Sequence, residues 1–242
     1  MKEQTLSQHL QELKNRLIYC LLALLITFGL SYYFSHEIYD FLAKPLVSAL
    51  AGQQDQKIIY TSLAEAFLTY FKLSFIAAFF FAFPFIALQF YLFLAPALYK
   101  NEKKFILKLM FFCPLLFILG AIMLYELVMP LAFKFFISFQ NLNPDQSLPI
   151  ELQTKISEYL GLIIKMIFAF GIAFQLPIFL ICLVKFGIVT KDSLKKKRKY
   201  WIVIIFTIAA IITPPDIISQ VTLALPMILL YEIAILILRK YD

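Results

Sequence analysis

Apolar segments of about 20 residues dominate this sequence, and their length limits the available folds more than any other feature. There are six, at approximately residues 17–34, 66–93, 109–137, 159–184, 200–212 and 217–238. A helix of about 20 apolar residues is long enough to cross the hydrocarbon core of a bilayer. Only 15% of the residues are charged, whereas a soluble domain has roughly 25%. The sequence therefore predicts an all-α polytopic membrane protein with six transmembrane helices, forming a single integral membrane domain over residues 1–242.

The basic residues predict the orientation of these helices. Of the 22 Lys and Arg residues, three lie in the N-terminal segment, four in the second connection, seven in the fourth and two in the tail. The connections on the opposite side hold only Lys44, Lys57 and Lys155. Because cytoplasmic loops carry an excess of Lys and Arg, both termini are predicted to be cytoplasmic. On the outer side, "EIYDFLAKPLVSAL" is partly amphipathic and predicts a surface helix as far as Pro45.

The fifth segment is too short for an ordinary crossing, and the sixth could also be short. About 13 helical residues span roughly 20 Å, against a hydrocarbon core of roughly 30 Å. Pro214 and Pro215 end this segment, because proline lacks the backbone N–H and disfavours helix in the residue before it. We expect the turn to lie below the outer lipid surface, next to a thinned bilayer where other helices or a substrate are handled.

Several polar residues interrupt the apolar segments. Gln175 lies in the middle of the fourth segment, just before Pro177. It could form a clasp between helices or belong to a polar transport cleft. Thr213, Asp216 and Gln220 add polar groups around the short turn, where Asp216 could also cap the sixth helix.

Two acids and one base within the apolar segments are predicted to have structural rather than functional roles. Glu126 and Lys134 are eight residues apart on the third segment, on nearly one face but about two turns apart, so neither neutralises the other. Glu232 lies near the cytoplasmic end of the sixth segment, where it could accept hydrogen bonds from a neighbouring helix.

Two further acids lie in cytoplasmic stretches. Glu12 and Arg16 in "HLQELKNRL" have i, i+4 spacing, which taken alone indicates a surface ion pair. Glu102 in "LAPALYKNEKKF" lies among four lysines. The positive-inside rule explains these lysines but does not explain the carboxylate.

Four stretches in order, covering nearly the whole chain, resemble the TatC family, the multispanning core of the twin-arginine protein translocase. They are "HLQELKNRL", "FLAPALYKNEKKF", "AFGIAFQLPI" and "TPPDIISQVTLALPMILLYEI". The resemblance implies a multi-pass protein of the bacterial plasma (inner) membrane, which is a signal-peptide receptor and not an enzyme. It implies transport of folded proteins by the proton-motive force, together with single-span TatA/TatB-type subunits and in multiple copies. No cofactor, metal or nucleic acid is expected.

The resemblance also assigns candidate residues. Glu12 and Glu102 match the family's signal-binding acids, with Lys14 and Arg16 beside them, and surrounding lysines could orient the peptide or anionic lipid headgroups. Gln175, Thr213, Asp216 and Gln220 fall in polar regions of the transport cleft or the partner-subunit site.

The sequence departs from the family pattern in two places. Lys14 stands at a motif position that is usually Arg, and Gln175 stands where the family often has Glu. An amide hydrogen-bonds but does not titrate, so no proton step is expected at residue 175, and Glu126 is a candidate substitute.

Two other function classes compete with this interpretation. A secondary transporter for a small solute is the first, but such proteins often contain internal repeats, and none is found in this sequence. An intramembrane enzyme is the second, but the sequence contains no Gly-x-Ser-x-Gly, no HExxH and no mid-membrane pair of aspartates. It also lacks the phosphate-binding loop GxxxxGK[ST], so the chain is not expected to hydrolyse ATP itself.

Overall fold

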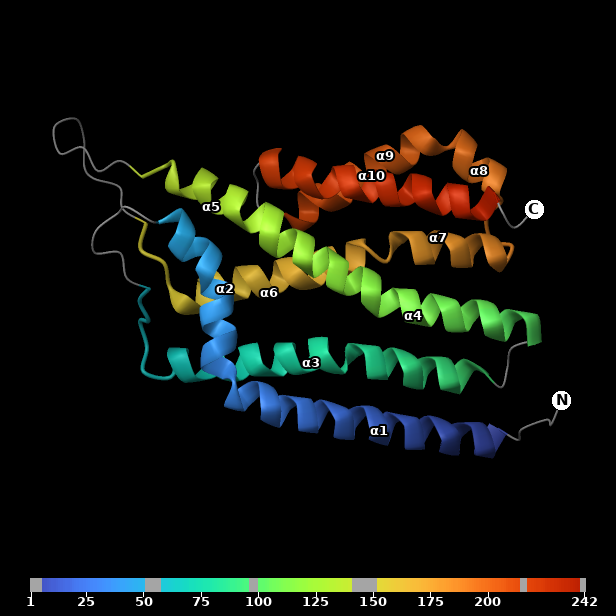
Figure 1. The fold of residues 1–242 in the computed structure, drawn as a ribbon, viewed down its shortest axis with the longest axis horizontal. Helices are drawn as coiled ribbons and strands as arrows, with labels where there is room; N and C mark the ends of the chain where they lie inside the picture. The colour runs from blue at the N-terminus through green and yellow to red at the C-terminus, as the bar shows by residue number, and fades with distance from the viewer. Residues whose placement is uncertain (1–5, 51–57, 96–99, 141–151, 214–216, 240–242) are drawn as a thin grey trace. The chain divides into compact units, whose positions relative to one another are not determined.

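The computed structural model describes residues 6–50, 58–95, 100–140, 152–213 and 217–239. These residues form a succession of helices (Figure 1). Their bounds are α1 (Leu6–Tyr33), α2 (Ser35–Ala49), α3 (Glu65–Leu94), α4 (Lys100–Met123), the π-helix η2 (Leu124–Val128), α5 (Met129–Ile137), α6 (Ile156–Ala173), α7 (Leu176–Lys185), α8 (Lys191–Lys196), α9 (Arg198–Ile212) and α10 (Ile217–Arg239).

Within the described residues, five helical segments have the length and hydropathy of membrane spans. They are Ser7–Tyr33, Glu65–Phe93, Phe105–Ile137, Ile156–Lys185 and Ser219–Leu238. The remaining predicted crossing is α9, whose 15 residues extend only about 22 Å. The shortness of the fifth crossing is therefore confirmed. Helix α10, with 23 residues, is about 35 Å long and is not short for a bilayer.

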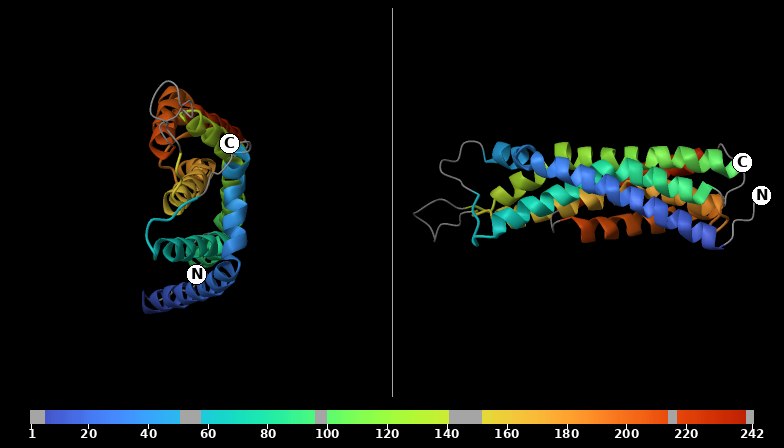
Figure 2. Two further views of the ribbon diagram at one scale, coloured as in Figure 1. Left: turned by 90° about the vertical axis from the view of Figure 1, so that its left-hand side faces the viewer. Right: turned by 90° about the horizontal axis from the view of Figure 1, so that it is seen from below.

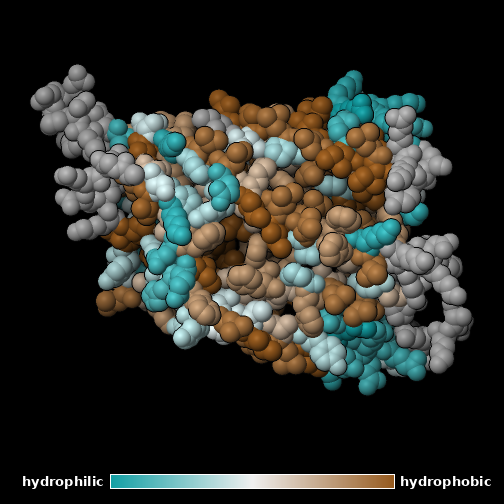
Figure 3. All heavy atoms as spheres, viewed as in Figure 1, coloured by the Kyte–Doolittle hydropathy of each residue, from teal (hydrophilic) through white to brown (hydrophobic). Residues whose placement is uncertain are grey.

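The chain divides into two compact units. The first comprises residues up to Phe41 together with Ser62–Leu115, and the second comprises Leu42–Thr61 and the residues from Leu116 onward. Apolar residues cover much of the surface along the helices, whereas hydrophilic residues gather around α8 and at the beginning of α1 (Figure 3). This distribution is expected for helices that meet lipid along their length and water at their ends. The single membrane domain over residues 1–242 stays a prediction.

In the first unit, α1 packs antiparallel against α3 (Figures 1 and 2). The Thr27 hydroxyl donates a hydrogen bond to the Ala78 carbonyl at 3.2 Å, and the rings of Phe28 and Phe71 form a T-shaped pair with their centroids 5.2 Å apart. Ala78 is completely buried, so its small side chain allows this close approach of the two backbones. The antiparallel arrangement places the beginning of α1 beside the end of α3.

In the second unit, glycines allow α6 to approach the residues that follow Leu115 in α4. A Cβ on Gly171 would overlap the ring of Phe117, and a Cβ on Gly120 would lie 2.8 Å from the Phe170 carbonyl oxygen. Farther along the helix pair, the Tyr159 ring packs against Phe133. Its hydroxyl donates to the Leu42 carbonyl at 2.8 Å, which satisfies a buried polar group.

Three sequence predictions about helix bounds need correction. The first crossing, predicted from residue 17, belongs to a helix that already begins at Leu6, because "HLQELKNRL" has helical periodicity and no breaking residue. Helix α2 does not end at Pro45 but continues to Ala49. Leu42 and Leu46, 6% and 3% exposed, lie on either side of this proline, and their burial stabilises the helix despite it. The fourth crossing is two helices, α6 and α7, broken ahead of Pro177.

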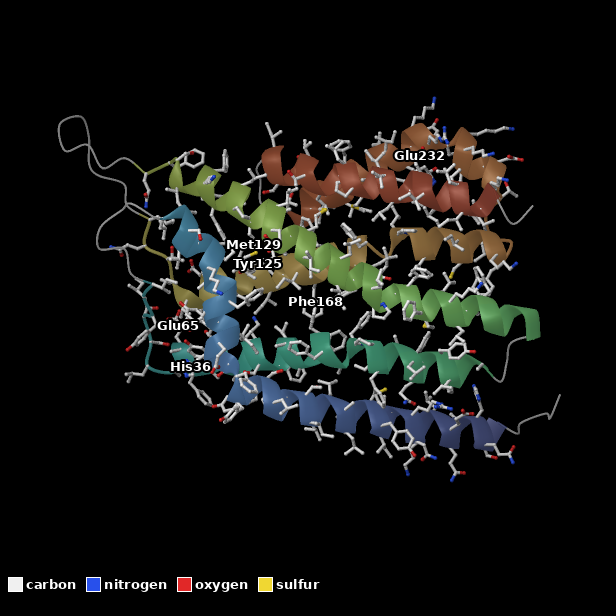
Figure 4. All side chains as sticks on the ribbon, viewed as in Figure 1. His36, Glu65, Tyr125, Met129, Phe168 and Glu232 are labelled. Carbon is white, nitrogen blue, oxygen red and sulfur yellow. The ribbon has the colours of Figure 1, made fainter. Side chains whose placement is uncertain are left out.

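The third crossing contains a wider turn that the sequence reading did not predict. Across η2 the Met129 N–H donates to the Leu124 carbonyl, five residues back. Pro130 follows directly, and a proline ring clashes with the carbonyl four residues earlier, here that of Glu126, so widening the turn relieves the clash. Tyr125 and Met129, labelled in Figure 4, lie on this stretch. Glu126 lies within this π-turn, so its position around the helix relative to Lys134 differs from that in the regular α-helix assumed in the prediction.

Candidate functional site

The beginning of α1 carries a polar face. A recess of about 380 Å³ is lined by Gln8, Gln11, Glu12, Asn15, Arg16 and Tyr19. Their spacing of three and four residues places them along one side of the helix. Because α1 continues into a membrane span, this polar face can bind a polar or charged ligand at the membrane–water interface.

Glu12 and Arg16 form the centre of this face. The Arg16 Nη2 and Nε donate to Glu12 Oε1 at 2.8 and 3.1 Å. Arg16 Nη1 donates to the side-chain oxygen of Gln89 on α3 at 3.1 Å. The Glu12 and Arg16 side chains are 22% and 23% exposed, so both charges are partly withdrawn from water. This is more than the isolated surface ion pair that the spacing alone indicates.

Gln89 is a site residue that the sequence reading missed. It is 8% exposed on α3 and holds the Arg16 guanidinium from the neighbouring helix. One turn farther along α3, the Phe93 ring stacks on His9 at 4.5 Å. The sequence could have indicated Gln89, because it is the single amide side chain in the long apolar block of residues 66–93. An amide at such a position needs a hydrogen-bond partner.

The structure gives less information on Lys14 and Glu102, the other two residues assigned to this site. Lys14 is exposed on α1. Glu102 lies in the first turn of α4, in the same compact unit as Glu12, but its side chain is outside the described residues. Figure 1 shows the beginning of α4 at the same end of that unit as the beginning of α1. The convergence of the two carboxylates therefore stays a prediction.

The second group of candidate residues lies in the other unit. Gln175 is at the break between α6 and α7, rather than inside one helix, and its side-chain nitrogen donates to the Gly171 carbonyl at 3.3 Å. The Thr213 hydroxyl donates to the Ala209 carbonyl at 2.8 Å at the end of α9. Gln220 on α10 donates to the Phe206 carbonyl of α9 at 3.3 Å. Asp216 falls outside the described residues.

These bonds give Thr213 and Gln220 a structural role in the α9–α10 hairpin, with Gln220 joining the two helices. At the other end of the pair, Arg198 Nη2 donates to Glu232 Oε2 at 2.8 Å (Glu232 is labelled in Figure 4). This confirms the prediction that Glu232 accepts a hydrogen bond from a neighbouring helix.

Comparison with known proteins identifies the family. The model of the family "Sec-independent protein translocase protein (TatC)" matches residues 8–226. The chain belongs to the TatC family. A TatC protein of Rickettsia prowazekii is 50% identical over 237 residues, covering 98% of this chain and 93% of the relative. The TatC of Escherichia coli is 36% identical over 238 residues, covering 98% and 89%.

A solved TatC structure also has the same fold. The crystal structure of the twin-arginine translocase receptor TatC, in the detergent DDM, superposes with a TM-score of 0.73 at 39% identity. The match covers 95% of this chain and 98% of that one. The six-helix polytopic membrane fold predicted from the sequence is thereby confirmed, whereas the side on which the termini lie stays a prediction.

Proposed function

We propose that this chain is the twin-arginine signal-peptide receptor and core subunit of a Sec-independent translocase, driven by the proton-motive force. The observation that carries the proposal is the partly buried Glu12 carboxylate in the polar recess of α1. An arginine side chain offers a planar fork of N–H donors that matches a carboxylate. Glu102, at the same end of the first unit, supplies a second carboxylate for the second arginine.

The first prediction concerns peptide binding by these acids. In the purified full chain, Glu12→Gln and Glu102→Gln should each weaken binding of a twin-arginine signal peptide by at least about tenfold, because each removes a charge-assisted hydrogen bond. Binding is measured by fluorescence anisotropy in detergent, with a Lys–Lys peptide for comparison. Glu37→Gln is the matched control, because Glu37 is exposed on α2 in the same unit. Arginine-selective binding that survives both substitutions would reject the assigned acids.

We also propose that single-span partner subunits dock beside the α9–α10 hairpin. Helix α9 is about 22 Å long, and a thinned bilayer next to it would favour a partner helix that is itself short. Ile211 and Ile217, on either side of the turn, are each 79% exposed and present apolar surface there.

The second prediction tests that docking site. A photo-crosslinking amino acid at Ile211 or Ile217 should form adducts with co-expressed single-span subunits in membranes. The same amino acid at Leu25, which is 58% exposed on α1, provides the control at a lipid-facing position. Crosslinks at Leu25 alone would place the partner elsewhere and contradict the docking site.

A further inference from the structure

A guanidinium of this chain already occupies the Glu12 carboxylate. Both hydrogen bonds from Arg16 go to Oε1, and within the described part of the chain Glu12 Oε2 accepts none. We propose that Arg16 is a built-in competitor for the signal peptide, and that displacing it makes Glu12 selective for arginine over lysine. This inference rests on the proposed receptor function.

Arg16 is held at this position by the neighbouring helix. An exposed i, i+4 ion pair contributes little and its long side chains move freely. Here Gln89, which is 8% exposed on α3, accepts a bond from Arg16 Nη1 at 3.1 Å. The guanidinium is therefore fixed at two helices and remains a resident occupant of Glu12.

An incoming arginine can replace this occupant at little cost. It brings the same planar fork of donors, so the two bonds that Arg16 gives up at Oε1 are remade, and Oε2 becomes available for a bidentate pair. The displaced Arg16 keeps an acceptor in Gln89. The exchange is one guanidinium for another at the carboxylate, and the two donors that Arg16 withdraws from Glu12 can turn to water, since this side chain is 23% exposed.

An incoming lysine cannot make the same exchange. Its ammonium is a compact point charge that cannot form two parallel bonds to a carboxylate. The lysine could instead approach Oε2 while Arg16 stays in place. The carboxylate is then already paired with Arg16, and the positive charge of Arg16 repels the ammonium. Either route is unfavourable, so the resident guanidinium discriminates against lysine.

The test compares Arg–Arg and Lys–Lys signal peptides on the full chain in detergent, with Arg16→Gln and Arg16→Lys variants. Arg16→Gln frees the carboxylate and should tighten Lys–Lys binding by about fivefold, so the preference for Arg–Arg falls. Arg16→Lys retains the charge but not the fork, so it should shift Lys–Lys binding in the same direction.

The outcomes separate this inference from its alternatives. A misfolded variant loses affinity for both peptides, whereas the inference requires a gain for one of them. If Arg16→Gln leaves Lys–Lys binding unchanged or weaker, Arg16 is not a competitor. If Arg16→Lys behaves as the unmodified chain, charge alone accounts for the discrimination and the fork argument fails. An unmodified chain that shows no arginine preference would reject the receptor function itself, before any Arg16 variant is compared.

Discussion

Gly161 and Gly171 lie on the same helix but in different surroundings. Both belong to α6, yet a Cβ on Gly161 meets nothing within 4 Å, whereas one on Gly171 would overlap the Phe117 ring. Phe117 is only 3% exposed, so its ring has little room to move away. The two positions therefore separate the effect of helix propensity from the effect of packing.

Gly171→Ala should destabilise the protein by about 1–3 kcal/mol, because it overpacks the contact with Phe117. Gly161→Ala should be neutral or slightly stabilising, since alanine is the better helix former and space is open there. Thermal unfolding in one detergent, followed by circular dichroism, measures both. Equal melting temperatures for the two variants would contradict the close packing of Gly171 on Phe117.

At the scale of the element, one side chain begins helix α8. The Thr190 hydroxyl accepts a hydrogen bond from the Ser193 N–H at 3.2 Å, and Thr190 has the extended backbone of an N-cap. The helix has six residues, and its second turn contains Lys195 and Lys196, close to the negative end of the helix dipole. The Leu194 carbonyl, near its end, accepts a hydrogen bond from the buried Tyr231 hydroxyl at 2.8 Å.

Thr190→Ala should weaken this cap by about 1 kcal/mol. Amide hydrogen exchange over residues 191–196, measured by mass spectrometry, should then quicken by about fivefold. Thr190→Ser retains the hydroxyl and should exchange like the unmodified chain. Unchanged exchange in the alanine variant would mean that the Tyr231 bond, rather than the cap, holds α8 in place.

At the scale of the whole molecule, the predicted orientation can be tested by chemical labelling. Lys195 is exposed on α8 and Leu63 is 99% exposed ahead of α3. With Cys20, Cys113 and Cys182 replaced, Leu63→Cys should react with a membrane-impermeant maleimide on intact spheroplasts. Lys195→Cys should react only after permeabilisation. The reverse pattern would place the termini outside and contradict the charge-based prediction.

Prolines show how far a sequence predicts helix bounds. The chain breaks just ahead of Pro177, in a crossing predicted as one segment, whereas Pro45 did not end α2 and Pro130 produced a π-turn that the sequence did not reveal. A proline always removes a donor and crowds the preceding turn. Whether the chain kinks, widens or continues depends on burial of its neighbours, such as Leu46 beside Pro45.

The sequence by itself determined the membrane class, the approximate crossings, the shortness of α9 and the family, because apolar length and local motifs are properties of the chain. Only the tertiary structure decided which partner each polar side chain has. Glu12 and Arg16 were visible as a local pair, but Gln89, 73 residues farther along, joins them only because α3 packs antiparallel on α1. Hydrogen bonds require a few ångströms in space, and no spacing in the sequence specifies that distance across two helices.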